Sequence, residues 1–229
     1  MTPLARPSPN FDGRPDGTLI DMLVLHYTGM QTAEAALERL CDPAAPGGNR
    51  VSAHYVIDED GTVISLVEED RRAWHAGVSY WRSETDINAR SIGIELVNPG
   101  HEFGYRDFPA PQMAALEKLA KETLSRHPIP ARNVVGHADV APGRKTDPGE
   151  LFDWAALAQA GIGLWPGADV SDGDSAAVPK MLADYGYDVT DEAQAIAAFQ
   201  RHFHPESLDG RADAATAGRL GALLDRCGP

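Results

Sequence analysis

Short apolar runs alternate with amphipathic stretches along the first 165 residues of the chain. The apolar runs predict β-strands, and two of them flank a Glu-Asp-Gly turn that predicts a hairpin. The expected strands are 22–27, 54–58, 62–67, 91–97 and 133–136. Apolar residues at helical spacing predict helices at 32–41, 111–127 and 154–160. Strands that alternate with helices at this scale predict an α/β fold with a mixed central β-sheet flanked by helices.

The pattern changes near residue 165. The next nine residues, 166–174, are rich in Pro, Gly and Asp, which is typical of a linker. Beyond them, amphipathic stretches predict helices at about 176–185, 192–202 and 214–224. The expected organisation is a first domain over 1–165, a linker over 166–174 and a small three-helix domain over 175–229.

The composition limits the partners and the compartment. A net charge of −14 without a Lys/Arg-rich run argues against a nucleic-acid partner, which requires a concentrated basic surface. No run approaches the ~20 apolar residues of a membrane span. Residues 1–21 lack the apolar core of a secretory signal, which favours the cytoplasm, whereas a targeting segment missing from this sequence would indicate the periplasm or cell envelope. Cys41 and Cys227 match no motif spacing and are expected to be free thiols.

Two histidines lie at the ends of predicted strands. His26 follows Leu-Val-Leu and His137 follows Val-Val-Gly, and strand ends at the edge of an α/β sheet deliver side chains into a cleft. Asp147 lies ten residues after His137, in a loop that contains two prolines. Two imidazoles and one carboxylate leave a fourth tetrahedral position for water, which is the arrangement of a catalytic zinc site. Zinc lowers the pKa of bound water and polarises a carbonyl, and both effects promote amide hydrolysis.

Two further charged residues suit the same chemistry. Glu95 is alone in an apolar strand and is a candidate general base, because a carboxylate in such a strand requires a partner or a role. Lys145 is a candidate for stabilising an oxyanion. Each residue also has a plain structural explanation, since strand-end histidines are often structural and isolated charged residues are often solvated. Spacing alone therefore predicts no more than a metal hydrolase.

Five sequence blocks in order resemble one enzyme family. LVLHYTG, SAHYVI, RAWHAGVSYWR, NARSIGIELVNPG and VVGHADVAPGRKTDPG are similar to the motifs of the zinc-dependent N-acetylmuramoyl-L-alanine amidases of the AmpD/AmiD type. The resemblance covers about 22–154 and implies a mixed sheet flanked by helices, the fold of peptidoglycan-recognition proteins and phage lysozyme-type amidases. It implies hydrolysis of the amide bond between N-acetylmuramic acid, including its 1,6-anhydro form, and the L-alanine of peptidoglycan stem peptides, in cell-wall recycling or turnover.

The resemblance also assigns roles to residues. It places the Zn²⁺ ligands on His26, His137 and Asp147, the catalytic glutamate on Glu95 and the transition-state lysine on Lys145. Aspartate rather than cysteine as the third ligand points to the AmpD/AmiD branch. The implied partners are muropeptides, and we expect a monomer.

Substrate contacts are less closely defined by the motifs. His75 either borders the substrate or is a hydrogen-bonded structural histidine, and Asn98 either contacts substrate or forms a turn. Trp74 and Trp81 either form an apolar wall for substrate or pack in the core, and His54 is expected to face the interior rather than to bind metal. The remaining histidines match no motif and are expected at the surface: His101, His127, His202 and His204.

The C-terminal stretches resemble a small three-helix peptidoglycan-binding domain. The similar segments are LADYGYDV, AIAAFQRHFHPE and LDGRADAATAGRL. The alternative is a helical cap that only stabilises the first domain. We expect one set of polar residues to shape a turn and the start of the last helix rather than to bind ligand: Asp209, Gly210, Asp213 and Thr216.

Two other functions use the same features. A non-catalytic peptidoglycan-binding or sensing protein would share the fold, but the complete set of expected ligands argues against it. A zinc peptidase acting on the stem peptide would share the chemistry, but the order of the motifs argues against it. The sequence therefore predicts a muropeptide amidase and leaves open whether ordinary muramyl substrates are accepted beside anhydro ones.

Overall fold

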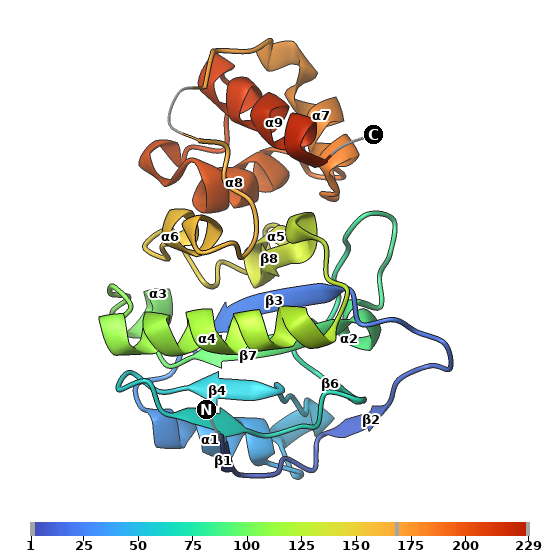
Figure 1. Cartoon of the computed structure of the whole chain (residues 1–229), viewed down its shortest axis with the longest axis vertical. Helices are drawn as coiled ribbons and strands as arrows, with labels where there is room; N and C mark the ends of the chain where they lie inside the picture. The colour runs from blue at the N-terminus through green and yellow to red at the C-terminus, as the bar shows by residue number, and fades with distance from the viewer. Residues whose placement is uncertain (1–2, 168–169, 228–229) are drawn as a thin grey trace.

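A computed structural model of the chain, which describes residues 3–167 and 170–227, is built around a six-stranded β-sheet (Figure 1). The strand order is β1-β5-β4-β7-β3-β8. The strands are β1 Leu4–Ala5, β3 Met22–Tyr27, β4 Tyr55–Ile57, β5 Val63–Ser65, β7 Ser91–Leu96 and β8 Val134–Gly136. β4 and β5 are the antiparallel hairpin that the sequence predicted, and β7 pairs in parallel with β4 and β3. The predicted mixed α/β sheet is thus confirmed.

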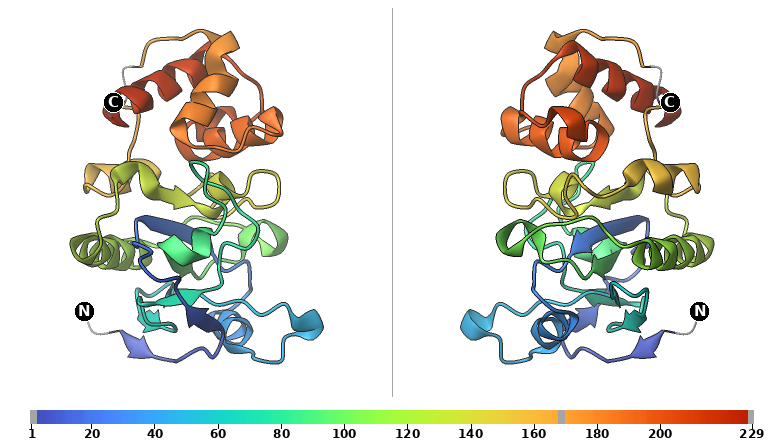
Figure 2. Two further views of the ribbon diagram at one scale, coloured as in Figure 1. Left: turned by 90° about the vertical axis from the view of Figure 1, so that its right-hand side faces the viewer. Right: turned by 90° about the vertical axis from the view of Figure 1, so that its left-hand side faces the viewer.

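Helices cover both faces of this sheet. The larger ones are α1 Ala33–Cys41, α4 Ala110–Arg126 and α6 Trp154–Gln159, and the shorter ones are α2 Ile87–Arg90, α3 Gly100–Phe103 and α5 His137–Val140. The side views show α4 and α1 on opposite sides of the sheet (Figure 2). Because side chains alternate along a strand, Leu23 and Leu25 pack with α4 and α6, whereas Met22 and Val24 face the other side. Strands covered on both faces explain the unbroken apolar runs of β3 and β7.

Three helices follow the first part of the chain, as the sequence predicted. They are α7 Val178–Tyr185, α8 Glu192–Phe203 and α9 Ala214–Cys227. One hydrophobic cluster joins them to the sheet: it contains Met22 and Val24 of β3 together with Leu182, Phe199 and Leu220. In Figure 1 they stand at the end of the molecule beyond β8. The boundaries 1–165, 166–174 and 175–229 stay predictions, and two residues of the expected linker, 168–169, lie outside the described residues.

Several short elements were not predicted. They include a two-stranded ribbon of β2 Phe11–Gly13 and β6 Arg71–Ala73, and the 3-10 turns η1 Pro46–Gly48, η2 Ala131–Asn133, η3 Ser175–Ala177 and η4 Pro205–Ser207. Two histidine predictions were wrong: His202 and His204, expected at the surface, are 4% and 6% exposed. His202, on α8, packs on Trp154 and bonds to Asp139, whereas His204, just beyond α8, lies near Glu206 of the same C-terminal part.

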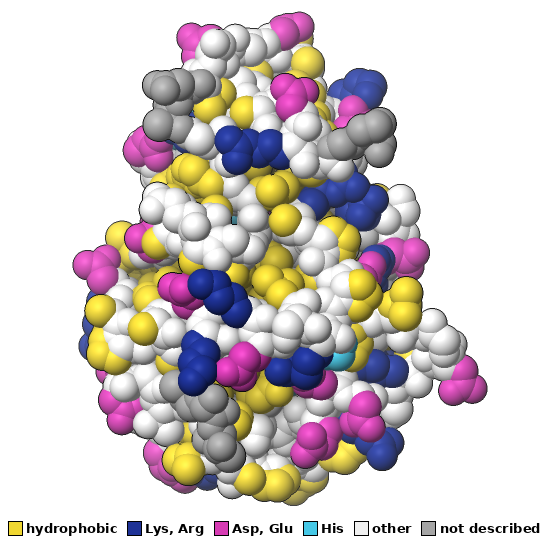
Figure 3. All heavy atoms as spheres, viewed as in Figure 1, with side chains coloured by type: hydrophobic (Ala, Val, Ile, Leu, Met, Phe, Trp, Pro, Cys, Tyr) yellow, Lys and Arg dark blue, Asp and Glu magenta, His cyan; other side chains and the backbone are white. Residues whose placement is uncertain are grey.

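Charged side chains of both signs occur on the surface, and the absence of a nucleic-acid partner stays a prediction. On the face shown in Figure 3, acidic and basic side chains are intermixed rather than gathered by sign. Within 3–167 and 170–227, no helix combines the length and apolar character needed to cross a bilayer. Cys41 and Cys227 are both free.

Candidate active site

Three side chains from separate segments converge at the carboxyl ends of the central strands. His26 lies near the end of β3, His137 begins α5 directly after β8, and Asp147 lies in the following loop. Nδ1 of His26 is 3.0 Å from Nδ1 of His137 and 3.0 Å from Oδ2 of Asp147, and the third separation is 3.1 Å. A tetrahedral zinc site with Zn–N distances of about 2.0 Å has donor atoms roughly 3.3 Å apart. The three donors are therefore close enough to share one small cation.

The strand register explains this convergence. β8 pairs with β3 in parallel, with Leu25 opposite Gly136. The residues that follow these two, His26 and His137, therefore lie side by side. The N–H of Ala138 donates to the carbonyl of Asp147 at 2.9 Å, which ties the loop back to α5. A Cβ at Gly136 would lie 2.7 Å from Cδ of Pro148, so glycine permits the loop to pack this closely.

A relay of hydrogen bonds orients His26 through Nε2, the ring nitrogen that points away from His137 and Asp147. This nitrogen is 3.0 Å from Nδ1 of His75, Nε2 of His75 is 3.1 Å from Oγ of Ser91, and Ser91 donates to the carbonyl of Ile87 at 2.6 Å. Since the Ser91 hydroxyl donates onward, each imidazole donates from Nε2. This leaves the Nδ1 lone pair of His26 directed at the cluster. A Cβ at Gly93 would lie 2.5 Å from the His75 ring, so glycine makes room for the relay.

His137 is oriented in the same way. Its Nε2 is 3.0 Å from the carbonyl of Ala76, which can only accept, so Nε2 donates and Nδ1 is directed at Asp147. Arg144 donates to the same carbonyl and to that of Val78, both at 2.6 Å. The structure therefore supplies a backbone acceptor for this ligand too, as is usual around metal-binding histidines.

The protonation states suit metal binding. Burial, followed by the nearby charge of His137, lowers the pKa of His26 to about 4, so its imidazole is neutral near pH 7. Burial by itself would raise the pKa of Asp147, but His137 and His26 bring it well below its ordinary value. Two imidazoles and one carboxylate form a donor set that zinc accepts, and the three residues fit a metal site.

Glu95 faces the same cluster from the neighbouring strand. It is the register partner of His26 in the β3–β7 pair. Its Oε2 is buried and has no hydrogen-bond partner among the described residues. Burial, and then the charge of Asp147, raise the pKa of Glu95 well above its ordinary value, while Lys145 opposes the shift. An unpartnered carboxyl group is costly to bury, which is typical of a group that exchanges protons with a ligand.

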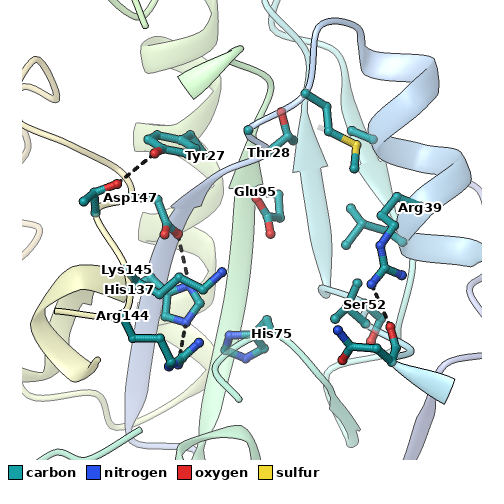
Figure 4. A pocket seen from close by; sticks show the side chains of 17 residues that line it. Tyr27, Thr28, Arg39, Ser52, His75, Glu95, His137, Arg144, Lys145 and Asp147 are labelled. Carbon is teal, nitrogen blue, oxygen red and sulfur yellow. Dashed lines mark hydrogen bonds and ion pairs between the residues drawn. The ribbon is translucent and has the colours of Figure 1, made fainter. Parts of the chain in front are cut away.

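One cleft of about 400 Å³ is lined by Glu95, His137, Lys145 and Asp147. Figure 4 shows His137, Arg144, Lys145 and Asp147 on one side, Glu95 between the walls, and Arg39 of α1 on the opposite side. Other lining residues are Tyr27, Thr28, Ser52 and His75. Four of the five residues that the sequence predicted as metal ligands or catalytic groups thus line the cleft, and the fifth, His26, is buried against two of them, His137 and Asp147.

Comparisons with known proteins agree with this geometry. The family model for N-acetylmuramoyl-L-alanine amidase matches residues 16–150, which include all five predicted residues. The chain belongs to the N-acetylmuramoyl-L-alanine amidase family. It is 39% identical to the amidase AmiD of Escherichia coli over 91% of this chain and 84% of that protein. It is also 39% identical to the 1,6-anhydro-N-acetylmuramyl-L-alanine amidase AmpD of Escherichia coli, over 65% of this chain and 86% of that protein.

A solved structure supports the same relationship. This chain resembles AmiD from Escherichia coli in its complex with anhydro-N-acetylmuramic acid-L-Ala-D-gamma-Glu-L-Lys, with a TM-score of 0.81 and 38% sequence identity. The match covers 93% of each chain, so it extends through the C-terminal helices as well as the amidase fold.

The residues predicted to contact substrate occupy different places around this amidase cleft. His75 lines the cleft but its ring nitrogens bond to His26 and Ser91, and Trp74 borders an adjoining cavity with Arg50 4.9 Å above its ring. Asn98 is fully buried, where its amide donates to the carbonyl of Arg106 and accepts from Gly100. Asn98 thus shapes the turn after β7, and its contact with substrate stays a prediction.

Two other predictions concern the interior. Trp81 is fully buried and packs on Tyr185 and Tyr187, which is the core alternative of the sequence analysis. His54 accepts from the N–H of Gly93 and lies 3.1 Å from the carbonyl of Arg71, so it stays outside the ligand cluster as expected.

Some cleft residues were not predicted. Arg144 lies next to Lys145 in a block that carries the resemblance, so the sequence held a signal for it. Ser52 likewise begins the SAHYVI block, whereas Arg39 lacks such a signal, because it reaches the cleft only through the packing of α1.

Proposed function

We propose that this chain is a zinc-dependent amidase that hydrolyses the bond between N-acetylmuramic acid, including its 1,6-anhydro form, and the L-alanine of peptidoglycan stem peptides. The observation that carries the proposal is the convergence of His26, His137 and Asp147 beside the unpartnered carboxyl group of Glu95. Membership of the amidase family supports the bond that is cut, and similarity to AmiD in complex with an anhydro-muropeptide supports the substrate class. The activity suits cell-wall recycling or turnover.

His26, His137 and Asp147 would hold the zinc ion. Zinc bound there supplies a polarised carbonyl and a water of lowered pKa. The protein's own contribution is orientation: His75 and the carbonyl of Ala76 fix the two imidazoles before any ligand arrives. Rigid donors lose little freedom on binding, which favours a single coordination geometry.

Glu95 carries the proton transfers in this proposal. Its carboxylate takes a proton from the attacking water and returns it to the departing amine of L-alanine. Burial without a hydrogen-bond partner keeps its pKa raised, so it is a stronger base than an exposed carboxylate. Lys145 supplies positive charge to the oxyanion that forms on the attacked carbonyl.

The test is product analysis on two muropeptides, one with an anhydro end and one with an intact reducing end. Mass spectrometry should show a free stem peptide and the released sugar moiety, and a chelator should abolish the release until zinc is restored. Cleavage of the anhydro form alone would indicate recycling, and cleavage of both would indicate a broader specificity. A folded, zinc-loaded protein that cleaves neither substrate would contradict the proposal and favour a binding or sensing protein, whereas cuts within the stem peptide would indicate a peptidase.

The cytoplasmic location and the monomeric state stay predictions. Cell fractionation tests the first, with the periplasm or cell envelope as the alternative result. Light scattering on the purified protein tests the second.

A further inference from the structure

Asp139 lies two residues after His137 and is buried at the junction with the C-terminal helices. Its side chain is 2% exposed. Oδ2 accepts from the N–H of Gly136 and from Nδ1 of His202, both at 2.7 Å, and Oδ1 accepts from the hydroxyl of Tyr187 at 2.6 Å. One carboxylate thus joins the end of β8, the segment after α7 and helix α8.

The same carboxylate lies close in the chain to the expected metal ligands. Gly136 directly precedes His137, so the hydrogen bond from its N–H holds the backbone on which that imidazole is mounted. The next residue, Ala138, donates to the carbonyl of Asp147. A short path of backbone and hydrogen bonds therefore connects the C-terminal helices with two of the three ligands.

The partners of Asp139 are themselves fixed by aromatic packing. His202 is stacked between Trp154 and Phe203, with ring centroids 3.7 Å away on each side. Tyr187 packs on Trp81 at 5.1 Å and on Phe199 at 6.1 Å. These contacts link residues of both parts of the molecule in a buried cluster, which is unlike the exposed, sparsely bonded junction of a freely tethered domain.

We propose that Tyr187 and His202 position His137 through Asp139, so that the C-terminal helices are part of the scaffold of the metal site. The proposal rests on the proposed function, because it takes His26, His137 and Asp147 as the metal ligands. Tyr187 and His202 are positioning residues, since neither lies in the cleft. Loss of both donors leaves the buried carboxylate of Asp139 with one partner, and the turn that bears His137 then relaxes toward other arrangements.

The test compares two full-length variants. Tyr187→Phe with His202→Phe removes both donors but keeps two aromatic rings in the cluster. Tyr185→Phe is the matched control, because Tyr185 is buried in the same cluster and no hydrogen bond joins it to Asp139 among the described residues. Zinc affinity is measured by competition with a chromophoric chelator, and circular dichroism verifies that each protein is folded.

We expect the double variant to bind zinc about 10–100-fold more weakly, which is the usual effect of removing support from behind a metal ligand. The control should stay within about twofold of the wild type, and saturating zinc should restore most of the activity of the double variant. If the double variant does not fold, Tyr187→Phe alone is used, with a weaker effect expected in the same direction.

The inference is overturned if the variants lose thermal stability but bind zinc within about twofold of the wild type. The junction would then only stabilise the fold. A wild-type protein that binds zinc but cleaves no muropeptide would refute the proposed function and leave the positioning role standing, whereas a wild type that binds no zinc would refute both.

Discussion

At the scale of single residues, Glu95 and His26 occupy partner positions on adjacent parallel strands. Their hydrogen-bonding surroundings differ, and this suits them to different chemical roles. His26 has both ring nitrogens engaged, one with the cluster and one with His75. Glu95 has a buried oxygen without a partner among the described residues. The first arrangement suits a fixed ligand, and the second suits a group that exchanges a proton with substrate.

Glu95→Gln should therefore separate metal binding from turnover. The amide is isosteric but cannot accept a proton, so kcat should fall about 10²–10⁴-fold, the usual contribution of a general base. Zinc content, measured by atomic absorption, should be unchanged. A variant with near wild-type kcat on a muropeptide would show that Glu95 is not the base.

His75 offers a second test, because the sequence left its role open. If it orients His26, His75→Ala should weaken zinc binding by about 10–100-fold and leave KM at saturating zinc almost unchanged. Ser91→Ala removes only the far end of the relay and should weaken zinc binding less. Chelator competition and steady-state kinetics measure the two effects. A raised KM with unchanged zinc affinity would instead identify His75 as a substrate contact.

Strand-end position suggested His26 and His137, residue chemistry suggested the other three central residues, and the ordered motifs assigned a role to all five. The sequence could not separate the alternatives for His75, Asn98 or Trp81. Their roles depend on which side of a strand or turn packs inward, and Trp81 meets its partners Tyr185 and Tyr187 only through contacts between distant parts of the chain. Burial of that kind leaves no local pattern.

At the scale of elements, six-residue β3 and β7 were predicted from apolar runs, whereas the two- and three-residue β1, β2 and β6 were not. These three strands lie in segments without an apolar run, and each pairs with a partner far away in sequence, β1 with β5 and β2 with β6. The long helix α4 shows the opposite case, since its apolar stripe predicted its bounds within a residue.

Glu69 connects the end of α4 with the sheet, because it accepts hydrogen bonds from Arg126 of α4 and from Tyr55 of β4. The pKa of Glu69 leads to a prediction about stability and pH. Burial would raise the pKa of Glu69, but hydrogen bonds from Arg126, His127 and Tyr55 lower it to about 2 from an ordinary 4.5. A lowered folded-state pKa stabilises the protein above pH 4.5, and that stabilisation is lost as the pH falls toward 2. Glu69→Gln should thus lower the free energy of unfolding by on the order of 2 kcal/mol at pH 7, with a smaller effect at pH ~3.

Urea denaturation at both pH values measures this difference. Glu117→Gln is a suitable control, because Glu117 makes an exposed ion pair with Lys121 on the same helix at 2.6 Å. Exposed pairs of this kind contribute roughly 0.3–0.5 kcal/mol, so the control should change little at either pH. An equal effect of Glu69→Gln at pH 7 and pH ~3 would contradict the assignment.

At the scale of the whole molecule, the sequence predicted three C-terminal helices but not how they dock. The amphipathic period identifies each helix, while docking depends on pairs such as Asp139 and His202, which are 63 residues apart. His202 was expected at the surface because a histidine in a helix carries no sign of a buried partner elsewhere. The resemblance of these helices to a peptidoglycan-binding domain stays a prediction, with a stabilising cap as the alternative.

The three proposed metal ligands also come from distant parts of the chain, so removal of the metal should affect the stability of the whole fold. His26, His137 and Asp147 come from β3, α5 and a loop, so a bound ion stabilises the folded state over the unfolded chain, in which these residues are apart. At free zinc ~100-fold above Kd the gain is about 2.7 kcal/mol, or a Tm higher by roughly 5–11 °C for a chain of this size. Calorimetry with and without chelator should show that shift in the wild type. His137→Ala should unfold at the same temperature under both conditions, because two donors cannot hold the ion tightly. A shift of equal size in His137→Ala would mean that zinc stabilises the protein at another site, and no shift in the wild type would mean that the three donors do not bind it.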